Sequence, residues 1–296
     1  QAAGRNLPDV IQMDYRYIFE YARRGALLPL NDLMPKVLDI ADFGESSISS
    51  GAVDGKLYGI NLGNNSTAMI VAAETYKQAG VNPPGPETTW DALADLATQF
   101  TKAAGKDKFY GTQDAGGVEP AFEVFVRGRG KSLYTDDGKL GFTADDAAEW
   151  FAYWDRLRKA KACPPADMQA LDKMNIETNL LTLGNTAISF AHSNQLVGYQ
   201  AVNQKKLTLT TLPAGGKPGP YLKPSMFFSI SAGTKNAEKA ARFINFFVKD
   251  PEAVKAIGVE RGVPASKVSR EVVADTLDEL GKTMLDFISF ITDKVG

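Results

Sequence analysis

Short apolar segments alternate with amphipathic ones from the start of the chain. Residues 8–13 (PDVIQM) are apolar and β-branched and open with a proline, which predicts a short strand. Asp14 can cap the helix that follows, which we expect to run from Tyr15 to Arg24. Because residues 26–34 are again apolar, this order of strand, helix and apolar segment predicts an α/β fold whose helices pack on a largely parallel sheet.

Two later segments carry strong helix signals. Thr89 and Thr143 can each cap a helix, and acidic residues follow in the first turn, where a carboxylate favours the helix dipole. Tryptophans recur on the apolar side of both segments at helical spacing, so we expect them to pack in the core and not to stack on a ligand. The apolar positions are Trp90, Leu93, Leu96 and Phe100 in the first helix and Trp150, Trp154 and Leu157 in the second.

The second half of the chain continues the alternation. Strands are expected at 185–190 (NTAISF), 206–213 (KLTLTTLP) and 225–231 (SMFFSIS), with a Gly/Pro loop at 214–224. Helices are expected to begin in 192–200 (HSNQLVGYQ), to cover 236–250, to restart at Pro251 and to cover 269–296. Both halves therefore predict mixed helix and strand content.

An extended stretch from residue 55 to Val71 is interrupted by four polar or small residues. They are Gly63, Asn64, Asn65 and Ser66. Such residues are poor core material in the middle of a strand. The segment is therefore either a loop between two strands or a strand that passes between two domains and lines a hydrated cleft with its middle.

The composition narrows the functional classes. The length of 296 residues suggests two domains, and 44% hydrophobic with 23% charged residues is typical of a globular protein with a large core. The 33 basic and 35 acidic residues are well interleaved and give a net charge of −2, which predicts neither nucleic-acid binding nor a polybasic membrane anchor. No apolar run is long enough to span a membrane.

Cysteine and histidine are scarce. The chain has one of each, Cys163 and His192, which rules out an intrachain disulfide and a Cys/His zinc cluster. We therefore expect no metal and no cofactor. Residues Gln1–Gly4 resemble the end of a helix, so we expect the sequence to begin inside a domain, after any export signal.

Three segments or residue pairs suggest catalysis or nucleotide binding. The segment GRGKS (128–132) resembles a phosphate-binding loop, but Phe125 stands where the pattern needs its first glycine, so a solvated turn is expected. His192 lacks a nucleophile elbow and is expected to be a polar cleft or capping residue. Hydrolysis by two carboxylates remains open, and Glu119 and Asp14 are the candidates for such a glycosidase.

Polar and aromatic residues gather after the ends of predicted strands, where open α/β sheets bind ligands. Carboxylates, amides and guanidinium groups match neighbouring sugar hydroxyls, and aromatic rings stack on their C–H faces. The residues in these positions are Asp14, Tyr15 and Arg16, then Asn64, Asn65 and Ser66, then His192, Ser193 and Asn194.

Seven segments follow one another across nearly the whole chain. They are AAGRNLPDVIQMD, EYARRGALLPLNDL, GKLYGI, AGVNPPGPETTWDALADLA, LGNTAISF, TLPAGG and SISAGTKNAEKAARFINFFVKDPEAV. This series resembles the bacterial extracellular (periplasmic) solute-binding proteins of family 1, the ABC-transporter sugar-binding proteins related to maltose-binding protein.

The resemblance implies a type II periplasmic-binding-protein fold, with two α/β lobes joined by a hinge of crossing strands. The chain is then expected to cross between lobes near 61–69, near 223–230 and shortly after 251–264. The implied lobes are 1–63 with 228–265, and 64–227 with 266–296.

The implied function is that of the substrate-binding subunit of an ABC importer, which catalyses nothing. A carbohydrate would be captured between the lobes by hinge closure and delivered to the membrane permease. The protein is expected to be monomeric, and periplasmic or extracellular and lipid-anchored. The alternatives are a non-sugar solute, either a polyamine or a glycerophosphodiester, and a glycoside hydrolase.

The resemblance also assigns individual ligand contacts. Asp14, Tyr15 and Arg16 would contribute from the first lobe. Glu119 and the possible stacking ring of Phe122 would contribute from the second. Further candidates are Asn194, where relatives often place an aromatic platform, then Ser225, Met226 and Arg261.

Two departures from the family pattern limit these assignments. The family's first strand and helix, which precede AAG, are expected to be missing from this sequence, and its last helices are cut short after DKVG. Val71 and Ala72 replace the usual tyrosine–asparagine pair, and Asn194 replaces an aromatic residue. The identity of the sugar is therefore left open.

Overall fold

The chain forms two compact units. The computed structural model describes residues 7–135 and 137–295. The first unit contains the residues up to Asn65 and Leu222–Ser289, and the second contains Ser66–Tyr221 and the residues from Phe290 onward. The chain therefore passes from one unit to the other at 65/66, 221/222 and 289/290. The expected end of a helix at Gln1–Gly4 lies outside the described residues.

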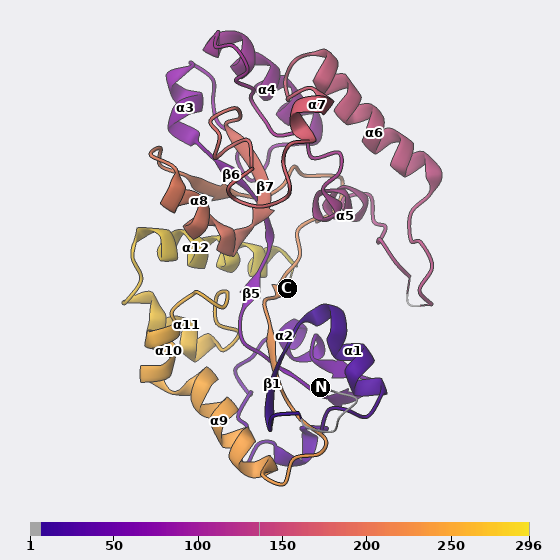
Figure 1. The fold of residues 1–296 in the computed structure, drawn as a ribbon, viewed down its shortest axis with the longest axis vertical. Coiled ribbons are helices and arrows are strands. Elements are labelled where there is room, and N and C mark those ends of the chain that lie inside the picture. The colour runs from indigo at the N-terminus through magenta and orange to yellow at the C-terminus, as the bar shows by residue number, and fades with distance from the viewer. Residues whose placement is uncertain (1–6, 136, 296) are drawn as a thin grey trace. The chain divides into compact units, whose positions relative to one another are not determined.

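The elements of the first unit come from both ends of the chain (Figure 1). From the N-terminal part they are β1 (Val10–Met13), α1 (Tyr15–Arg23), η2 (Asn31–Leu33), α2 (Glu45–Ser49), β2 (Ala52–Val53), β3 (Lys56–Leu57), β4 (Ile60–Asn61) and β5 (Asn64–Asn65). From the C-terminal part they are β9 (Lys223–Pro224), β10 (Phe227–Ile230), α9 (Ala237–Lys249), α10 (Pro251–Ile257), α11 (Lys267–Ala274) and most of α12 (Glu279–Val295).

The sheet of the first unit has the order β1-β10-β4. Val10 pairs with Ile230 at one end of the register, and Phe227 pairs with Met13 on one side and Asn61 on the other, all antiparallel. The prediction of a largely parallel sheet is therefore wrong for this unit. β1 and β4 do run parallel to each other, as a strand–helix–strand order predicts, but β10 from a distant part of the chain lies between them and runs opposite to both.

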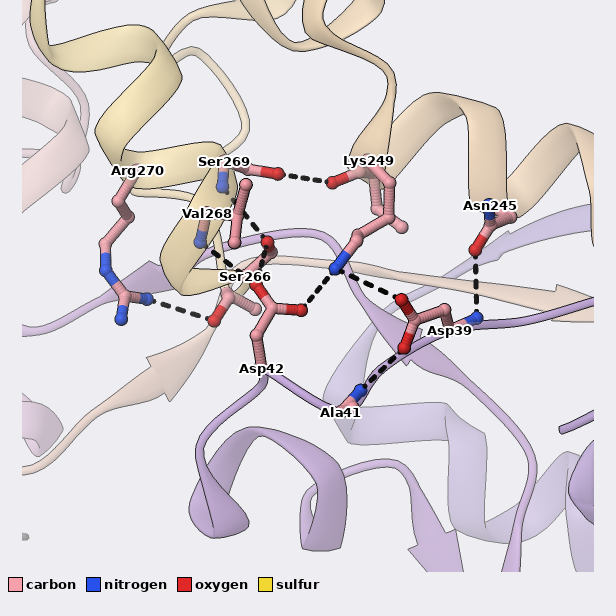
Figure 2. Close-up of polar contacts among 11 residues, drawn as sticks. Asp39, Ala41, Asp42, Asn245, Lys249, Ser266, Val268, Ser269 and Arg270 are labelled. Carbon is pink, nitrogen blue, oxygen red and sulfur yellow. Dashed lines mark hydrogen bonds and ion pairs between the residues drawn. The ribbon is translucent and has the colours of Figure 1, made fainter. Parts of the chain in front are cut away.

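Helices α9, α10 and α11 pack on one another, which places 266–289 in the first unit and not in the second, where we expected it. Figure 2 shows the polar contacts that fix this packing. The carboxylate of Asp42 accepts hydrogen bonds from Lys249 on α9 and from the hydroxyl of Ser266, which caps α11. It also accepts the backbone N–H of Val268 at 3.0 Å.

The second unit has a sheet of order β7-β6-β8 surrounded by helices (Figure 1). Its elements are β6 (Thr67–Val71), α3 (Ala73–Gln78), α4 (Trp90–Ala104), α5 (Glu119–Arg127), α6 (Ala144–Lys159), α7 (Ala166–Gln169), β7 (Ile188–His192), η3 (Ser193–Gln195), α8 (Leu196–Val202) and β8 (Thr208–Thr210). Both pairings of β6 are antiparallel, and all five residues of β6 are buried. β6 is therefore the central strand of this unit.

The core of the second unit is strongly aromatic. Trp90 lies edge-on to Trp150 at 5.3 Å between ring centroids, and Trp150 lies edge-on to Trp154 at 5.5 Å. All three tryptophans are at most 8% exposed. The expectation that the tryptophans of the two capped helices pack in the core is confirmed.

The segment 128–132 forms no phosphate cradle. Arg129 pairs with Glu149 and lies over the ring of Phe125, and Lys131 pairs with Asp146 at 2.5 Å. Its basic side chains are thus engaged by carboxylates of α6, in agreement with the turn that we expected. No helix of the described chain is both long and apolar enough to cross a membrane.

Candidate functional site

A pocket of about 220 Å³ lies within the second unit. It is built where the beginning of β6, the end of β7, the first turn of α5 and helix α8 meet. Its lining residues are Thr67, Gln113, Val118, Pro120, Ala121, Met174, Asn179, Phe190, Ala191, His192, Gln195, Tyr199 and Leu212. We refer to this site as the β6–β7 pocket.

Thr67 provides an unsatisfied polar group at this pocket. It lies opposite His192 in the antiparallel register of β6 and β7 and is 2% exposed. Its hydroxyl has no hydrogen-bond partner in the protein, although buried hydroxyls are almost always paired.

Gln113 is held rigidly beside β7. Its side-chain oxygen accepts hydrogen bonds from the hydroxyl of Ser189 and the backbone N–H of Phe190, both at 3.0 Å. Its side-chain nitrogen donates to Asp172 at 3.1 Å. Because a buried amide with both ends engaged cannot rotate freely, Gln113 presents a fixed polar surface to the pocket.

The lining carries no Asp, Glu, Lys or Arg among the described residues. Its titratable groups are His192 and Tyr199, and burial raises the pKa of Tyr199 above its usual value. The pocket thus combines hydroxyl, amide and imidazole groups with apolar side chains and two aromatic rings. This chemistry suits an uncharged, hydroxyl-bearing ligand and not an ion.

Ser66, His192 and Ser193, which we expected to contact a ligand after the ends of two strands, lie close together in the structure. The backbone N–H of Ser66 donates to the hydroxyl of Ser193 at 3.2 Å, and the backbone N–H of Ser193 donates to the carbonyl of Ser66 at 2.9 Å. His192 lines the pocket from the last position of β7, two residues beyond the end that we expected. The serines are buried and mutually bonded, so they fix the strand ends beside the pocket.

The other three candidates of this unit do not line the β6–β7 pocket. Glu119 begins α5 and is exposed, and Asn194 lies half-buried in η3. Phe122 was expected as a stacking ring, but it packs edge-on to Phe142 at 4.9 Å and near Trp150 at 5.7 Å. The helical turn directs Phe122 toward the aromatic core, whereas its neighbours Pro120 and Ala121 line the pocket, so its stacking on a ligand stays a prediction.

In the first unit, Asp14, Tyr15 and Arg16 lie together at the start of α1. The carboxylate of Asp14 accepts the backbone N–H of Arg16 at 2.7 Å and so caps the helix, as predicted. Tyr15 is 40% exposed and stacks on Phe227 at 6.2 Å between ring centroids. All three side chains are exposed, so they form an accessible polar and aromatic group at the end of β1.

The remaining candidates meet where β5, β9 and the segment 261–263 lie side by side. Asn64 is buried, with its amide bonded to Asn61 at 2.9 Å and to Ser47 at 3.0 Å, so its side chain has a structural role. The hydroxyl of Ser225 donates to the carbonyl of Arg261. Asn65 is buried, Met226 is half-buried against the core of this unit, and Arg261 is exposed.

Several residues of the β6–β7 pocket were not predicted from the sequence. Gln113, Met174, Asn179 and Tyr199 lie in segments that carried no site prediction. Gln113 is 76 residues from Ser189 and 59 from Asp172 in the chain, so no local spacing connects them. The only signal that could have identified them is that a pair of polar residues lies beside the buried strand GNTAISF. That signal is visible only once the tertiary contact is known.

Metal and nucleophile chemistry find little support in the described residues. They contain no group of three or more His, Cys, Asp or Glu side chains that could hold a metal ion. Cys163 is buried, and burial raises the pKa of its thiol, which makes it a poor nucleophile. Asp14 and Glu119, weighed as a hydrolytic pair, belong to different units.

Comparison with known proteins gives a clear family. Residues 1–279 match the model of the family described as bacterial extracellular solute-binding protein. A solved structure of an extracellular solute-binding protein of family 1 from Alicyclobacillus acidocaldarius is 32% identical, with a TM-score of 0.82 over 99% of this chain and 73% of that one. The expected two-lobed α/β fold is therefore confirmed.

Two curated relatives are more distant. The arabinooligosaccharide-binding protein of Bacillus subtilis is 26% identical over 165 residues, which is 55% of this chain and 37% of that protein. The lactose-binding protein of Rhizobium radiobacter is 22% identical over 273 residues, which is 88% of this chain and 61% of that protein. The chain thus spans less than two thirds of the length of either relative. The family is one of binding proteins and not of enzymes, as expected, and on the match over residues 1–279 this chain belongs to the bacterial extracellular solute-binding proteins.

Proposed function

We propose that this protein captures a neutral carbohydrate and that the β6–β7 pocket holds part of it. The observation that carries this proposal is the uncharged polar lining of the pocket, in which the buried hydroxyl of Thr67 lacks a partner. A sugar hydroxyl is both a donor and an acceptor, so it can either donate a hydrogen bond to the Thr67 hydroxyl or accept one from it. The rings of Phe190 and Tyr199 offer apolar surface for the C–H faces of a sugar.

A charged solute fits this pocket less well. A polyamine or a glycerophosphodiester would need an opposite charge to offset the loss of its hydration. The described lining offers none, apart from what His192 can gain on protonation. The names of the two curated relatives, which bind arabinooligosaccharides and lactose, support a carbohydrate.

The wider role that we propose is that of the substrate-binding subunit of an ABC importer, which delivers the sugar to the membrane permease. We propose a monomer, either periplasmic or extracellular and lipid-anchored, in agreement with the extracellular family. Ligand capture would proceed by hinge closure between the two units at the crossing segments. A shift from mostly open to mostly closed needs about 5.5 kcal/mol of differential binding, which several hydrogen bonds of about 1 kcal/mol each and ring contacts can supply.

The first experiment is a ligand screen of the full chain by thermal shift, followed by calorimetry of the hits. The panel contains lactose, arabinotriose, galactose, glucose and maltotriose, together with spermidine, putrescine and glycerophosphocholine. We expect a saccharide to raise the melting temperature. A shift with spermidine or glycerophosphocholine and with no saccharide would overturn the carbohydrate proposal.

The second experiment tests the pocket itself with Thr67→Val. This change keeps the shape of the side chain and removes the hydroxyl, so we expect affinity for the saccharide to fall by about 1 kcal/mol, or roughly fivefold, with no loss of stability. Thr210→Val is the matched control, because the Thr210 hydroxyl is also buried and unpaired but does not line the described pocket. Equal affinity in both variants would show that the ligand does not contact Thr67.

A further inference from the structure

Asp172 is half-buried and joins two of the side chains that line the β6–β7 pocket. Its Oδ2 accepts hydrogen bonds from the amide nitrogens of Gln113 at 3.1 Å and of Asn179 at 2.9 Å. Gln169 donates a third, longer bond to the same oxygen at 3.5 Å. Asp172 itself does not line the pocket, so any effect that it has on a ligand passes through its neighbours.

The oxygen ends of both amides are already occupied. The oxygen of Gln113 accepts from Ser189 and Phe190, and the oxygen of Asn179 accepts the backbone N–H of Leu181 at 3.0 Å. Donors on the oxygen side and an acceptor on the nitrogen side leave only one orientation for each amide. Each NH₂ group has two hydrogens, and Asp172 takes one of them. Both side chains line the pocket and are 1% and 3% exposed, and within the described residues each NH₂ group makes no hydrogen bond besides the one to Asp172.

Asp172 is well suited to accept hydrogen bonds from these two amides. Within the described residues it forms no ion pair with Lys or Arg, and burial raises the pKa of its carboxyl group, against the lowering effect of its hydrogen bonds to Met174, Gln169 and Asn179. Its second oxygen accepts the backbone N–H of Met174 at 2.9 Å. Met174 lines the pocket and has a positive φ of 60°, a conformation that is rare for a residue with a side chain. Asp172 thus also fixes the rim of the pocket.

We propose that Asp172 is a positioning residue that determines specificity: it holds Gln113 and Asn179 so that each directs one N–H donor at the ligand. The end of the sugar that meets these amides must therefore present acceptor oxygens. This inference rests on the proposed carbohydrate function, and it adds the polarity that the ligand must have at this end of the pocket.

Asp172→Asn tests the proposal in the full chain. The new side chain has the same shape, but one of its two ends becomes an NH₂ group that faces either the two amides or the backbone N–H of Met174, so one of these sets of contacts must be lost. We expect affinity for the saccharide that binds best in the panel to fall about tenfold. Asp167→Asn is the control, since it removes the same charge from an exposed residue of α7 that lies five positions away, and it should leave the affinity unchanged.

Two further readouts separate positioning from a general loss of structure. Deoxyfluoro analogues of the sugar keep a weak acceptor and lose the donor, whereas deoxy analogues lose both. Where the amides donate to the sugar, wild type should prefer the fluoro analogue to the deoxy analogue, and Asp172→Asn should lose that preference. In ligand-free protein, the side-chain NH₂ resonances of Gln113 and Asn179 should shift in Asp172→Asn and stay in place in Asp167→Asn.

The outcomes distinguish this inference from the proposed function. Unchanged affinity in Asp172→Asn, or unchanged NH₂ resonances, would overturn the role of Asp172 while leaving carbohydrate binding intact. If wild type binds no saccharide of the panel, the proposed function fails, and the NH₂ resonances alone then decide whether Asp172 holds the two amides.

Discussion

The contacts of Asp42 in the first unit predict a large and pH-dependent contribution to stability (Figure 2). Its carboxylate joins the loop before α2 to Lys249 on α9 and to the capped start of α11 through Ser266 and Val268. The side chains of Asp42 and Lys249 are only 19% and 18% exposed. Replacing Asp42 by Asn removes the charge that faces Lys249 while keeping the shape of the side chain.

The expected magnitude follows from the pKa of Asp42. Burial alone would raise this pKa, but the hydrogen bonds from Lys249, Ser266 and Val268 outweigh it and lower the pKa from 3.8 to about 2. A difference of one pH unit corresponds to about 1.4 kcal/mol, so the ionised carboxylate stabilises the folded state by about 2 kcal/mol. Because the pKa is lower in the folded protein, this stabilisation is fully present above about pH 4 and is lost as the pH falls through 2.

Urea unfolding followed by far-UV circular dichroism measures this effect. With a slope of about 2 kcal/mol per molar urea, Asp42→Asn should lower the midpoint at pH 7 by roughly 1 M. The gap between the two proteins should fall to less than half at pH 2.5, because Asp42 is then almost fully protonated in the unfolded wild-type chain and must lose that proton on folding, which offsets most of the stabilisation. Asp54→Asn is the control, since Asp54 is 75% exposed in its pair with Arg23 and should have little effect.

Two results would refute this reasoning. If Asp42→Asn unfolds at the same urea concentration as wild type, the contacts of Asp42 do not stabilise the packing of α9 and α11. If the gap persists unchanged at pH 2.5, the loss comes from the shape or packing of the new side chain and not from the missing charge.

Two further predictions concern the second unit. Thr143→Ala removes the hydroxyl that caps α6 and its contact with Asp146. Calorimetry should show that the free energy of unfolding falls by about 1 kcal/mol and the melting temperature by roughly 2–4 °C. Thr143→Ser keeps the hydroxyl and should retain most of the stability. Equal melting temperatures for the Ala and Ser variants would contradict the role of the cap. Cys163 is 1% exposed, and burial raises the pKa of its thiol. A thiol reagent should therefore label it in urea and not in the native protein. Rapid labelling of the native protein would show that the site opens readily.

Local signals predicted the helices of the second unit well. Thr89 and Thr143 were expected to cap helices, and α4 and α6 begin at the residues that directly follow them. A cap depends on hydrogen bonds within one turn, so the sequence contains all the information needed to place it. The apolar stripes of these helices likewise predicted which face is buried, because helical spacing alone determines which side chains share a face.

Pairing between strands could not be predicted in the same way. The expected strand 225–231 exists as β10, but nothing near it in the sequence indicates that Phe227 pairs with both Met13 and Asn61. Those contacts join residues far apart in the chain. For the same reason the sequence could not show that α11 belongs with α9, since Asp42 supplies the contacts that bind them.

The candidate site was predicted in part. Strand ends directed attention to His192, which lines the β6–β7 pocket, and to Ser66 and Ser193 beside it, and their contact with a ligand stays a prediction. They also suggested Asn64, whose polar atoms are taken up by Asn61 and Ser47, because a polar residue type does not reveal whether its partners lie inside the protein. Gln113 and Asp172 were missed, since they gain a role only once folding places them side by side.

The position of β10 between β1 and β4 has a consequence for the order in which the protein folds. The three strands of the second unit's sheet all lie between residues 67 and 210, so that sheet does not need the rest of the chain in order to form. The first unit cannot complete its sheet until Phe227–Ile230 has been synthesised. Until then β1 and β4 lack the strand that lies between them and leave their hydrogen-bonding edges exposed. In the order of synthesis the sheet of the second unit can therefore be complete before that of the first, although the first unit begins earlier in the sequence.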